Sequence, residues 1–155
     1  MTPMTTALDR LRDLGLSLPA PTQAIANYVP FVVEDGWIQV SGQLPMQDGR
    51  LAVAGTVGAD VSIEQGYEAA RLCALSALGH LAQAAGDLER VRIVRVGGFV
   101  ASAPGFIEQP QVVNGASDLL VAVLGDKGRH ARAAVGVSSL PRGAAVEVEV
   151  LARMT

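Results

Sequence analysis

Residues 128–152, GRHARAAVGVSSLPRGAAVEVEVLA, hold the features from which the fold and the chemistry of this chain can be predicted. Three cationic or titratable side chains come directly before an apolar segment: Arg129, His130 and Arg132. A Leu-Pro break follows, and then a segment in which Val and Glu alternate. Alternation with a period of two is typical of a β-strand with one buried face. We therefore expect two strands here, over residues 132–138 and 145–152.

The alternating segment assigns its side chains to two faces of a strand. Its valines point one way, whereas Glu147 and Glu149 point the other way. If the valines pack beneath helices, the glutamates face solvent or a subunit interface. Arg132 is flanked by small apolar residues, so we expect it to be partly buried and to need a partner. Glu147 or Glu149 is the natural partner, although patterning alone equally allows a solvated strand face and a surface arginine.

The composition favours an oligomer over a monomer. Half of the 155 residues are hydrophobic, and the mean hydropathy is +0.33. No apolar run approaches the roughly 20 residues that are needed to cross a bilayer. We therefore assign the surplus of apolar surface to subunit interfaces. At this length we expect a single domain with one core.

Several classes of function are disfavoured. The net charge is −3, and eleven arginines and one lysine are scattered along the chain, which argues against a nucleic-acid partner. Cys73 is the only cysteine, so no intramolecular disulfide or cysteine metal cluster is expected. The two histidines lack metal-ligand spacing, and the glycine-rich pieces match no nucleotide-binding loop. We expect no cofactor, no metal, no membrane partner and, without a signal-peptide pattern, a cytoplasmic location.

The remaining sequence alternates between helical and extended patterns. The surest element is a long helix that begins after Ser62, with Gln65 completing a capping box, and that ends at Gly86. Gly97-Gly98 indicates a bulge or a close backbone approach. The order of elements predicts an α+β domain with helices on one sheet face. The other predicted elements lie at residues 5–14 (helix), 27–33 and 37–41 (a hairpin), 51–53 (a weak strand), 90–100 (strand) and 110–124 (helix).

Four segments resemble the RidA/YjgF family, which is also called the reactive intermediate imine deaminase or "endoribonuclease L-PSP" family. They are SGQLP (41–45), VNGASDLL (113–120), ARAAVGVSSLP (131–141) and VEVEVLA (146–152), in the order and spacing of the family. The resemblance implies a single RidA-like domain over residues 1–155. Its family core covers residues 20–153, and residues 1–18 form an N-terminal helical extension. It implies a chorismate-mutase-like (bacillary type) α+β fold, with a mixed sheet and helices on one face. It also implies a homotrimer with ligand clefts between subunits.

The resemblance also implies roles for particular residues. Arg132 matches the arginine that binds the carboxylate of a 2-imino acid, and Glu147 matches the glutamate that positions the attacking water. Three further positions match residues near the ligand: Tyr28, Ser41 and Asn114. The chain departs from the family before Ala131, where Gly-Arg-His replaces Phe-Pro, and at Ala134, where the family often has cysteine. We therefore expect Arg129 and His130 at the rim of the pocket, where they would bind substrate.

The function implied by the resemblance is hydrolysis of reactive 2-imino acids to 2-keto acids and ammonia. A planar guanidinium binds a carboxylate through two parallel hydrogen bonds, and a carboxylate can activate water beside it. This chemistry needs no cofactor. Two alternatives stay open: a non-catalytic trimer that binds a small carboxylate and reports it to a partner, and a ribonuclease, which would need an acid–base pair and a basic groove.

Overall fold

The computed structural model describes residues 4–20 and 27–155. Its elements in chain order are α1 (Ala7–Asp13), β1 (Phe31–Glu34), β2 (Trp37–Gln43), β3 (Met46–Gln47), β4 (Arg50–Leu51), α2 (Ile63–Ala85), η1 (Leu88–Arg90), β5 (Val91–Ala101), α3 (Gln109–Leu124), η2 (Gly125–Gly128), β6 (Ala131–Val137), η3 (Pro141–Gly143) and β7 (Val146–Met154).

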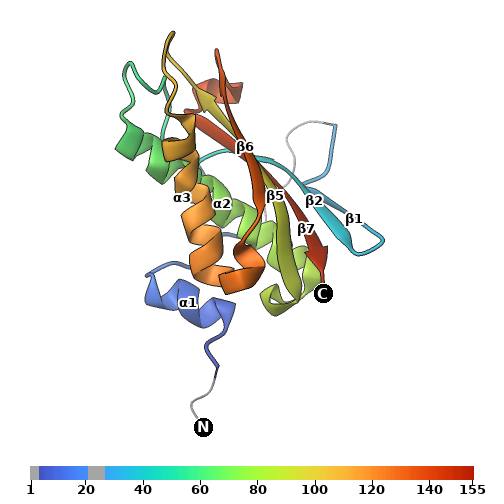
Figure 1. Ribbon diagram of the computed structural model, residues 1–155. Coiled ribbons are helices and arrows are strands. Elements are labelled where there is room, and N and C mark those ends of the chain that lie inside the picture. Colours follow the sequence, from blue (N-terminus) through green and yellow to red (C-terminus); the bar gives the residue numbers. More distant parts are fainter. Residues whose placement is uncertain (1–3, 21–26) are drawn as a thin grey trace.

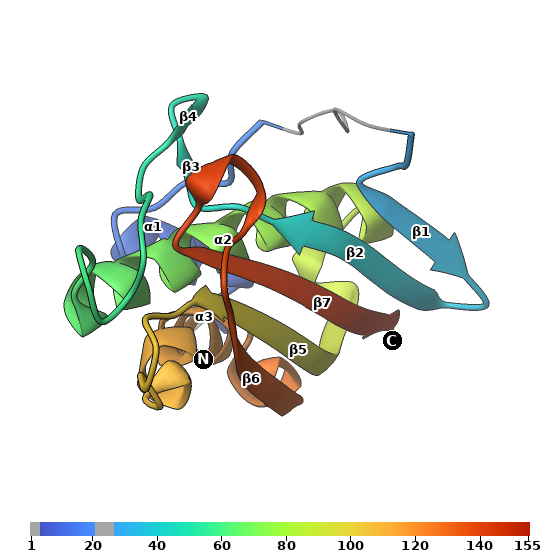
Figure 2. The same ribbon diagram turned by 90° about the horizontal axis from the view of Figure 1, so that it is seen from above.

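The predicted mixed sheet is present. Its strand order is β1-β2-β7-β5-β6, with β5 and β6 parallel and all other neighbours antiparallel. Figures 1 and 2 show α2 and α3 against the same face of this sheet. The parallel pair β5 and β6 is joined through α3, as a parallel connection requires. This crossover places β6 at one edge of the sheet, beside α3.

The long helix α2 begins and ends as predicted. The Ser62 hydroxyl accepts from the Gln65 amide, the Gln65 side chain accepts from the Ser62 amide, and Gly86 caps the end in the left-handed region. Small residues on α2 and α3 let the two helices approach closely. A Cβ at Gly115 of α3 would overlap the carbonyl oxygen of Tyr67 on α2. Glycine at this position is therefore a packing requirement.

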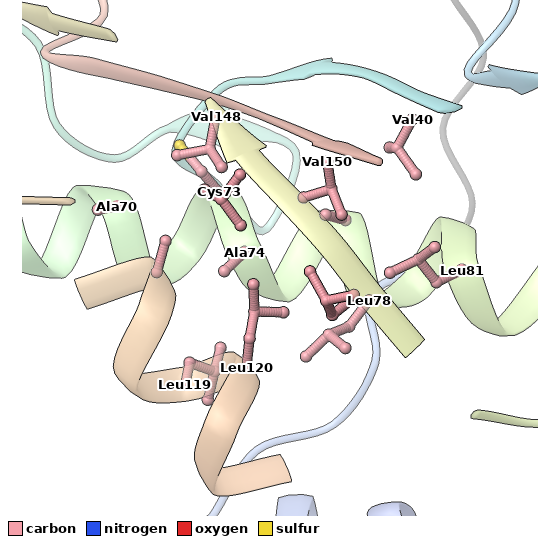
Figure 3. Packing of buried hydrophobic residues seen from close by; sticks show 14 of the residues in the cluster. Val40, Ala70, Cys73, Ala74, Leu78, Leu81, Leu119, Leu120, Val148 and Val150 are labelled. Carbon is pink, nitrogen blue, oxygen red and sulfur yellow. The ribbon is translucent and has the colours of Figure 1, made fainter. Parts of the chain in front are cut away.

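The hydrophobic core lies between the sheet and the two long helices. Figure 3 shows Val148 and Val150 of β7 pointing toward α2, where Cys73 and Leu78 meet them. Val146, Val148 and Val150 are fully buried, whereas the two glutamates between them are half-buried. The predicted two-faced pattern of β7 is thus confirmed. Burial of each such side chain contributes about 1.5–3 kcal/mol.

Three predicted details differ from the structure. β1 begins at Phe31 rather than at residue 27, because Pro30 has no N–H to donate to a ladder. The predicted strand over 51–53 is a short hairpin of β3 and β4 instead. The register shift in β5 falls between Ile93 and Arg95, not at the double glycine. The alternative reading of the double glycine, a close approach, is confirmed, since a Cβ at Gly98 would crowd Val113 of α3.

The opposite face of the sheet carries no helix in the part of the chain that the structure describes (Figure 2). Large apolar side chains on this face are exposed to solvent: Trp37 to 39%, Val135 to 45% and Val32 to 52%. The Arg153 guanidinium stacks 4.7 Å from the Trp37 ring centroid. An exposed apolar sheet face of this kind is typical of a surface that binds another protein chain. We call it the open face.

Candidate active site

Arg132 lies on the helix-covered side of edge strand β6. The parallel register pairs it with Val96, which is fully buried beneath the helices, so the arginine side chain also points toward α3. Its Nη1 donates to Asn114 Oδ1 at 2.9 Å and to Ser117 Oγ at 3.1 Å, and its Nη2 donates to the Pro110 carbonyl at 3.4 Å. Those three acceptors follow the spacing i, i+4, i+7, which is one face of a helix.

In the described part of the chain, no acidic side chain pairs with the Arg132 guanidinium. All three of its acceptors are neutral, and among the described residues no carboxylate lies within 4.0 Å of its guanidinium. The side chain is half-buried, so water compensates the charge only in part. Arg132 is therefore oriented by the protein and remains able to bind an anion.

His130 belongs to the surroundings of Arg132. Its Nε2 lies 2.8 Å from Ser117 Oγ, and its Nδ1 is bonded to the Gly128 carbonyl. Burial lowers the pKa of His130, and the charge of Arg132 lowers it further, against an opposing effect of the Gly128 carbonyl. Arg129, which the sequence places next to it, lies apart: its side chain is exposed and pairs with Asp126 at 3.5 Å.

Glu147 lies on the open face. Its strand partner is Phe99, and Phe99 is three residues along β5 from Val96, so the two point to opposite faces. A Cβ at Gly42 would overlap the Glu147 carboxylate, so glycine in the Ser-Gly-Gln segment leaves room for this side chain. Burial raises the pKa of Glu147, and the neighbouring Glu149 carboxylate raises it further.

Tyr28 comes before β1 and Ser41 lies near the end of β2, so both are at the open end of the β1–β2 hairpin. The Ser41 hydroxyl donates to the Val29 carbonyl at 2.7 Å, and its amide donates to the Pro30 carbonyl at 2.9 Å. These bonds hold the chain directly after Tyr28, whose side chain is 53% exposed. Ser41 is thus adjacent to Gly42 and the glutamate, and not to Arg132.

The residues of the candidate site form two groups. The arginine group consists of Asn114, Ser117, His130 and Arg132; the glutamate group consists of Ser41, Gly42 and Glu147. Two predicted residues, Tyr28 and Arg129, belong to neither group. The structure brings together the members of each group but places the groups on opposite faces of one sheet. The prediction that Arg132 pairs with Glu147 or Glu149 is wrong within one chain, because Arg132 bonds to α3 and Glu149 pairs with Arg95 at 3.4 Å.

Two contributors to the site were not predicted. Ser117 stands three residues after Asn114, on the same helix face, and this spacing is the signal that could have identified it. Gly42 was predicted only as part of a motif, without its steric role. Within the described ranges no three His, Cys, Asp or Glu side chains gather to hold a metal ion, and no helix is long and apolar enough to cross a membrane.

Comparison with known proteins extends over nearly the whole chain. A family model described as "YjgF/chorismate mutase-like, putative endoribonuclease" matches residues 8–154. Protein TCP17 of Trypanosoma cruzi is 47% identical over 146 residues, which are 93% of this chain and 91% of that protein. Atu1372 from Agrobacterium tumefaciens, a structure with unknown function, is 47% identical with a TM-score of 0.91, covering 97% of this chain and 94% of that one. The structure of a putative endoribonuclease from Shewanella oneidensis is 36% identical with a TM-score of 0.93, covering 96% and 99%.

Proposed function

The chain belongs to the YjgF/chorismate mutase-like (RidA) family and has its chorismate-mutase-like fold, and on that premise we propose that it hydrolyses reactive 2-imino acids to 2-keto acids and ammonia. Arg132 binds the substrate carboxylate, and Glu147 activates the water. Asn114 holds the arginine, Ser41 and Gly42 shape the wall around the glutamate, and Tyr28 lies at the edge of the cleft. The reaction needs no cofactor.

The observation that carries this proposal is the uncompensated charge of Arg132. A half-buried guanidinium that is held only by neutral acceptors favours a small anion as its missing partner. A 2-imino acid offers a carboxylate directly beside its electrophilic carbon. Charge-assisted hydrogen bonds of this kind contribute about 1.5–3 kcal/mol each. Capture of the carboxylate therefore fixes the position of the carbon that water attacks.

Glu147 supplies the proton transfers. Its oxygen takes a proton from a water molecule as that water's oxygen forms a bond to the imine carbon. The carboxylic acid then gives this proton to nitrogen, which leaves a carbinolamine with an NH₂ group. The carboxylate next moves the hydroxyl proton to the same nitrogen, and the carbon–nitrogen bond breaks as the carbonyl forms, so one water is consumed and one ammonia is released. The raised pKa of Glu147 makes it a stronger base than an ordinary surface carboxylate.

A homotrimer would complete the site. Because Arg132 and Glu147 lie on opposite faces of their own sheet, one cleft needs the arginine group of one subunit and the glutamate group of its neighbour. The exposed apolar residues of the open face supply a surface for this contact. The proposed assembly thus explains two features together: the uncovered sheet face and the separation of the two groups.

Arg132→Ala tests the function directly. An amino-acid oxidase generates 2-iminopropanoate in the assay, and ammonia release is followed with and without the protein. We expect the wild type to accelerate release and Arg132→Ala to lose the effect while keeping its oligomeric mass. An unchanged rate in the variant would contradict the proposal. Tight calorimetric binding of 2-oxobutanoate without turnover would favour the non-catalytic alternative, and RNA cleavage that survives in Arg132→Ala would favour the ribonuclease.

A further inference from the structure

Ser117 and His130 form a hydrogen-bond chain that ends on Arg132. Ser117 Oγ lies 3.1 Å from Arg132 Nη1 and 2.8 Å from His130 Nε2. The second ring nitrogen, His130 Nδ1, is bonded to the Gly128 carbonyl. The hydrogen bonds therefore link four groups in one series: the Gly128 carbonyl before β6, the His130 ring, the Ser117 hydroxyl on α3 and the Arg132 guanidinium.

The chemistry of the partners sets the direction of each hydrogen bond. A backbone carbonyl only accepts, so His130 Nδ1 carries a proton and donates to Gly128. In the neutral ring Nε2 then has a lone pair, and the Ser117 hydroxyl donates to it. This commits the only hydroxyl hydrogen of Ser117 to the histidine. The oxygen lone pairs of Ser117 are left to accept from Arg132, which can only donate.

The surroundings favour the neutral ring that this scheme needs. Burial lowers the pKa of His130, and the adjacent Arg132 charge lowers it further. The charged groups on neighbouring elements have other partners. Asp126 pairs with Arg129, Lys127 Nζ bonds the Glu89 carbonyl, and Asp118 on α3 accepts from Tyr67. None of these contacts offers His130 a carboxylate that would stabilise its protonated form.

The chain determines which edge of Arg132 is available. A guanidinium has five N–H donors. Nη1 uses its two donors on Asn114 and Ser117, and Nη2 uses one on Pro110. The donors left without an acceptor in the described part of the chain are Nε–H and the second hydrogen of Nη2. The three acceptors follow one another along α3, so we infer that Pro110 takes the Nη2 hydrogen on the Nη1 side. Nε–H and the other Nη2 hydrogen then lie along one edge of the planar group, the arrangement that binds a carboxylate through two parallel bonds.

Resting on the proposed function, we propose that Ser117 and His130 are positioning residues that hold Arg132 with its Nε/Nη2 edge toward the substrate carboxylate. His130 acts through Ser117 and does not itself touch the substrate. Loss of the hydrogen bonds of Ser117 lets the guanidinium rotate, so that in fewer molecules its Nε/Nη2 edge faces the substrate carboxylate. The Michaelis constant KM should rise while kcat changes little, because water activation by Glu147 is untouched.

Two substitutions of His130 separate its two hydrogen bonds. His130→Gln can place an amide oxygen near the position of Nε2 and accept from Ser117, but it loses the bond to Gly128. His130→Asn can donate to Gly128 from near the position of Nδ1, but it is too short to reach Ser117. We expect KM for the imino acid to rise about tenfold in Ser117→Ala and in His130→Asn, and to stay within about twofold of wild type in His130→Gln. Ser138→Ala, which removes an exposed hydroxyl just beyond β6, is the matched control.

The double variant Ser117→Ala/His130→Asn sharpens the test. If His130 acts through Ser117, the double variant should show no greater rise in KM than Ser117→Ala alone. Additive effects would overturn the proposal, as would a loss in His130→Gln that equals or exceeds the loss in His130→Asn. The latter result would mean that His130 only anchors the loop before β6. Unchanged KM in every variant would overturn it as well.

A measurement on the free protein keeps this inference separate from the proposed function. Nuclear magnetic resonance of the Arg132 side chain reports rotation of the guanidinium without any substrate. Separate Nη1 and Nη2 signals are expected in wild type and His130→Gln, and faster exchange in Ser117→Ala and His130→Asn. If the wild type neither hydrolyses imines nor binds 2-oxobutanoate, the proposed function fails and this measurement decides the positioning role alone. Identical exchange in all four proteins would refute it.

Discussion

Arg132 and Glu147 project from opposite faces of the same sheet. Arg132 pairs in register with the buried Val96 and bonds to α3, whereas Glu147 pairs with Phe99 and lies beside Gly42 on the open face. Residues three apart along β5 point in opposite directions, so no change of side-chain rotamer brings the two charges together. A site that uses both groups must therefore span two copies of the chain.

Mixed assemblies test this directly. Arg132→Ala and Glu147→Gln should each lose imine hydrolysis as pure proteins. When the two variants are unfolded together and refolded, random assembly gives about a quarter of the clefts an intact arginine from one subunit and an intact glutamate from the next. We expect recovery of about that share of wild-type activity. The control is the same mixture without co-refolding. Absence of any recovery, with mixed trimers confirmed by mass spectrometry, would contradict the two-subunit site.

The sequence was sufficient to predict the elements but not their relative register. The capping box at Ser62 and the alternation of β7 are local patterns, and both predictions are confirmed. Residues 131–137 carry almost only small apolar side chains, so nothing in that segment shows which face Arg132 occupies. Its face follows from the parallel pairing with β5, which is a long-range property of the crossover through α3. The expected contact with Glu147 failed for this reason.

The pH dependence of the rate should report the environment of Glu147. Its pKa lies above the ordinary value of 4.5 because of burial and the charge of Glu149. A general base acts when deprotonated, so the rate is full above this pKa and falls as the pH drops through it. Glu149→Gln removes one cause of the rise, and the acid limb of the kcat profile should therefore move to lower pH. The comparison is made in His130→Gln, which removes the one imidazole of the arginine group. If the acid limb stays in place or moves to higher pH, the charge of Glu149 does not raise the pKa of the group that acts as the base.

Two helical glycines should respond differently to alanine. At Gly115 the added Cβ would meet the Tyr67 carbonyl, which is backbone and cannot move without separating α2 from α3. We expect a loss of roughly 1–3 kcal/mol in the free energy of unfolding. At Gly66 the nearest atoms belong to the Val112 side chain, at 3.0 Å and 3.3 Å, and can shift. There the crowding is offset by a gain of about 1 kcal/mol in helix propensity. The two alanine variants are compared by the urea concentration at the midpoint of unfolding, measured at one protein concentration. Equal midpoints for Gly115→Ala and Gly66→Ala would contradict the packing argument.

Val135→Glu should break the assembly without unfolding the subunit. Val135 pairs with Phe99, faces the open side of the sheet and is 45% exposed, so a single subunit tolerates a charge there. In a trimer the same carboxylate would be buried in an apolar contact without a partner, which is strongly unfavourable. Light scattering should show a lower mass, circular dichroism should be unchanged, and imine hydrolysis should be lost with the two-subunit cleft. Ala122→Glu adds the same charge at an exposed position of α3 and should stay trimeric and active. If Val135→Glu kept both its mass and its activity, the open face could not be the surface that completes the site.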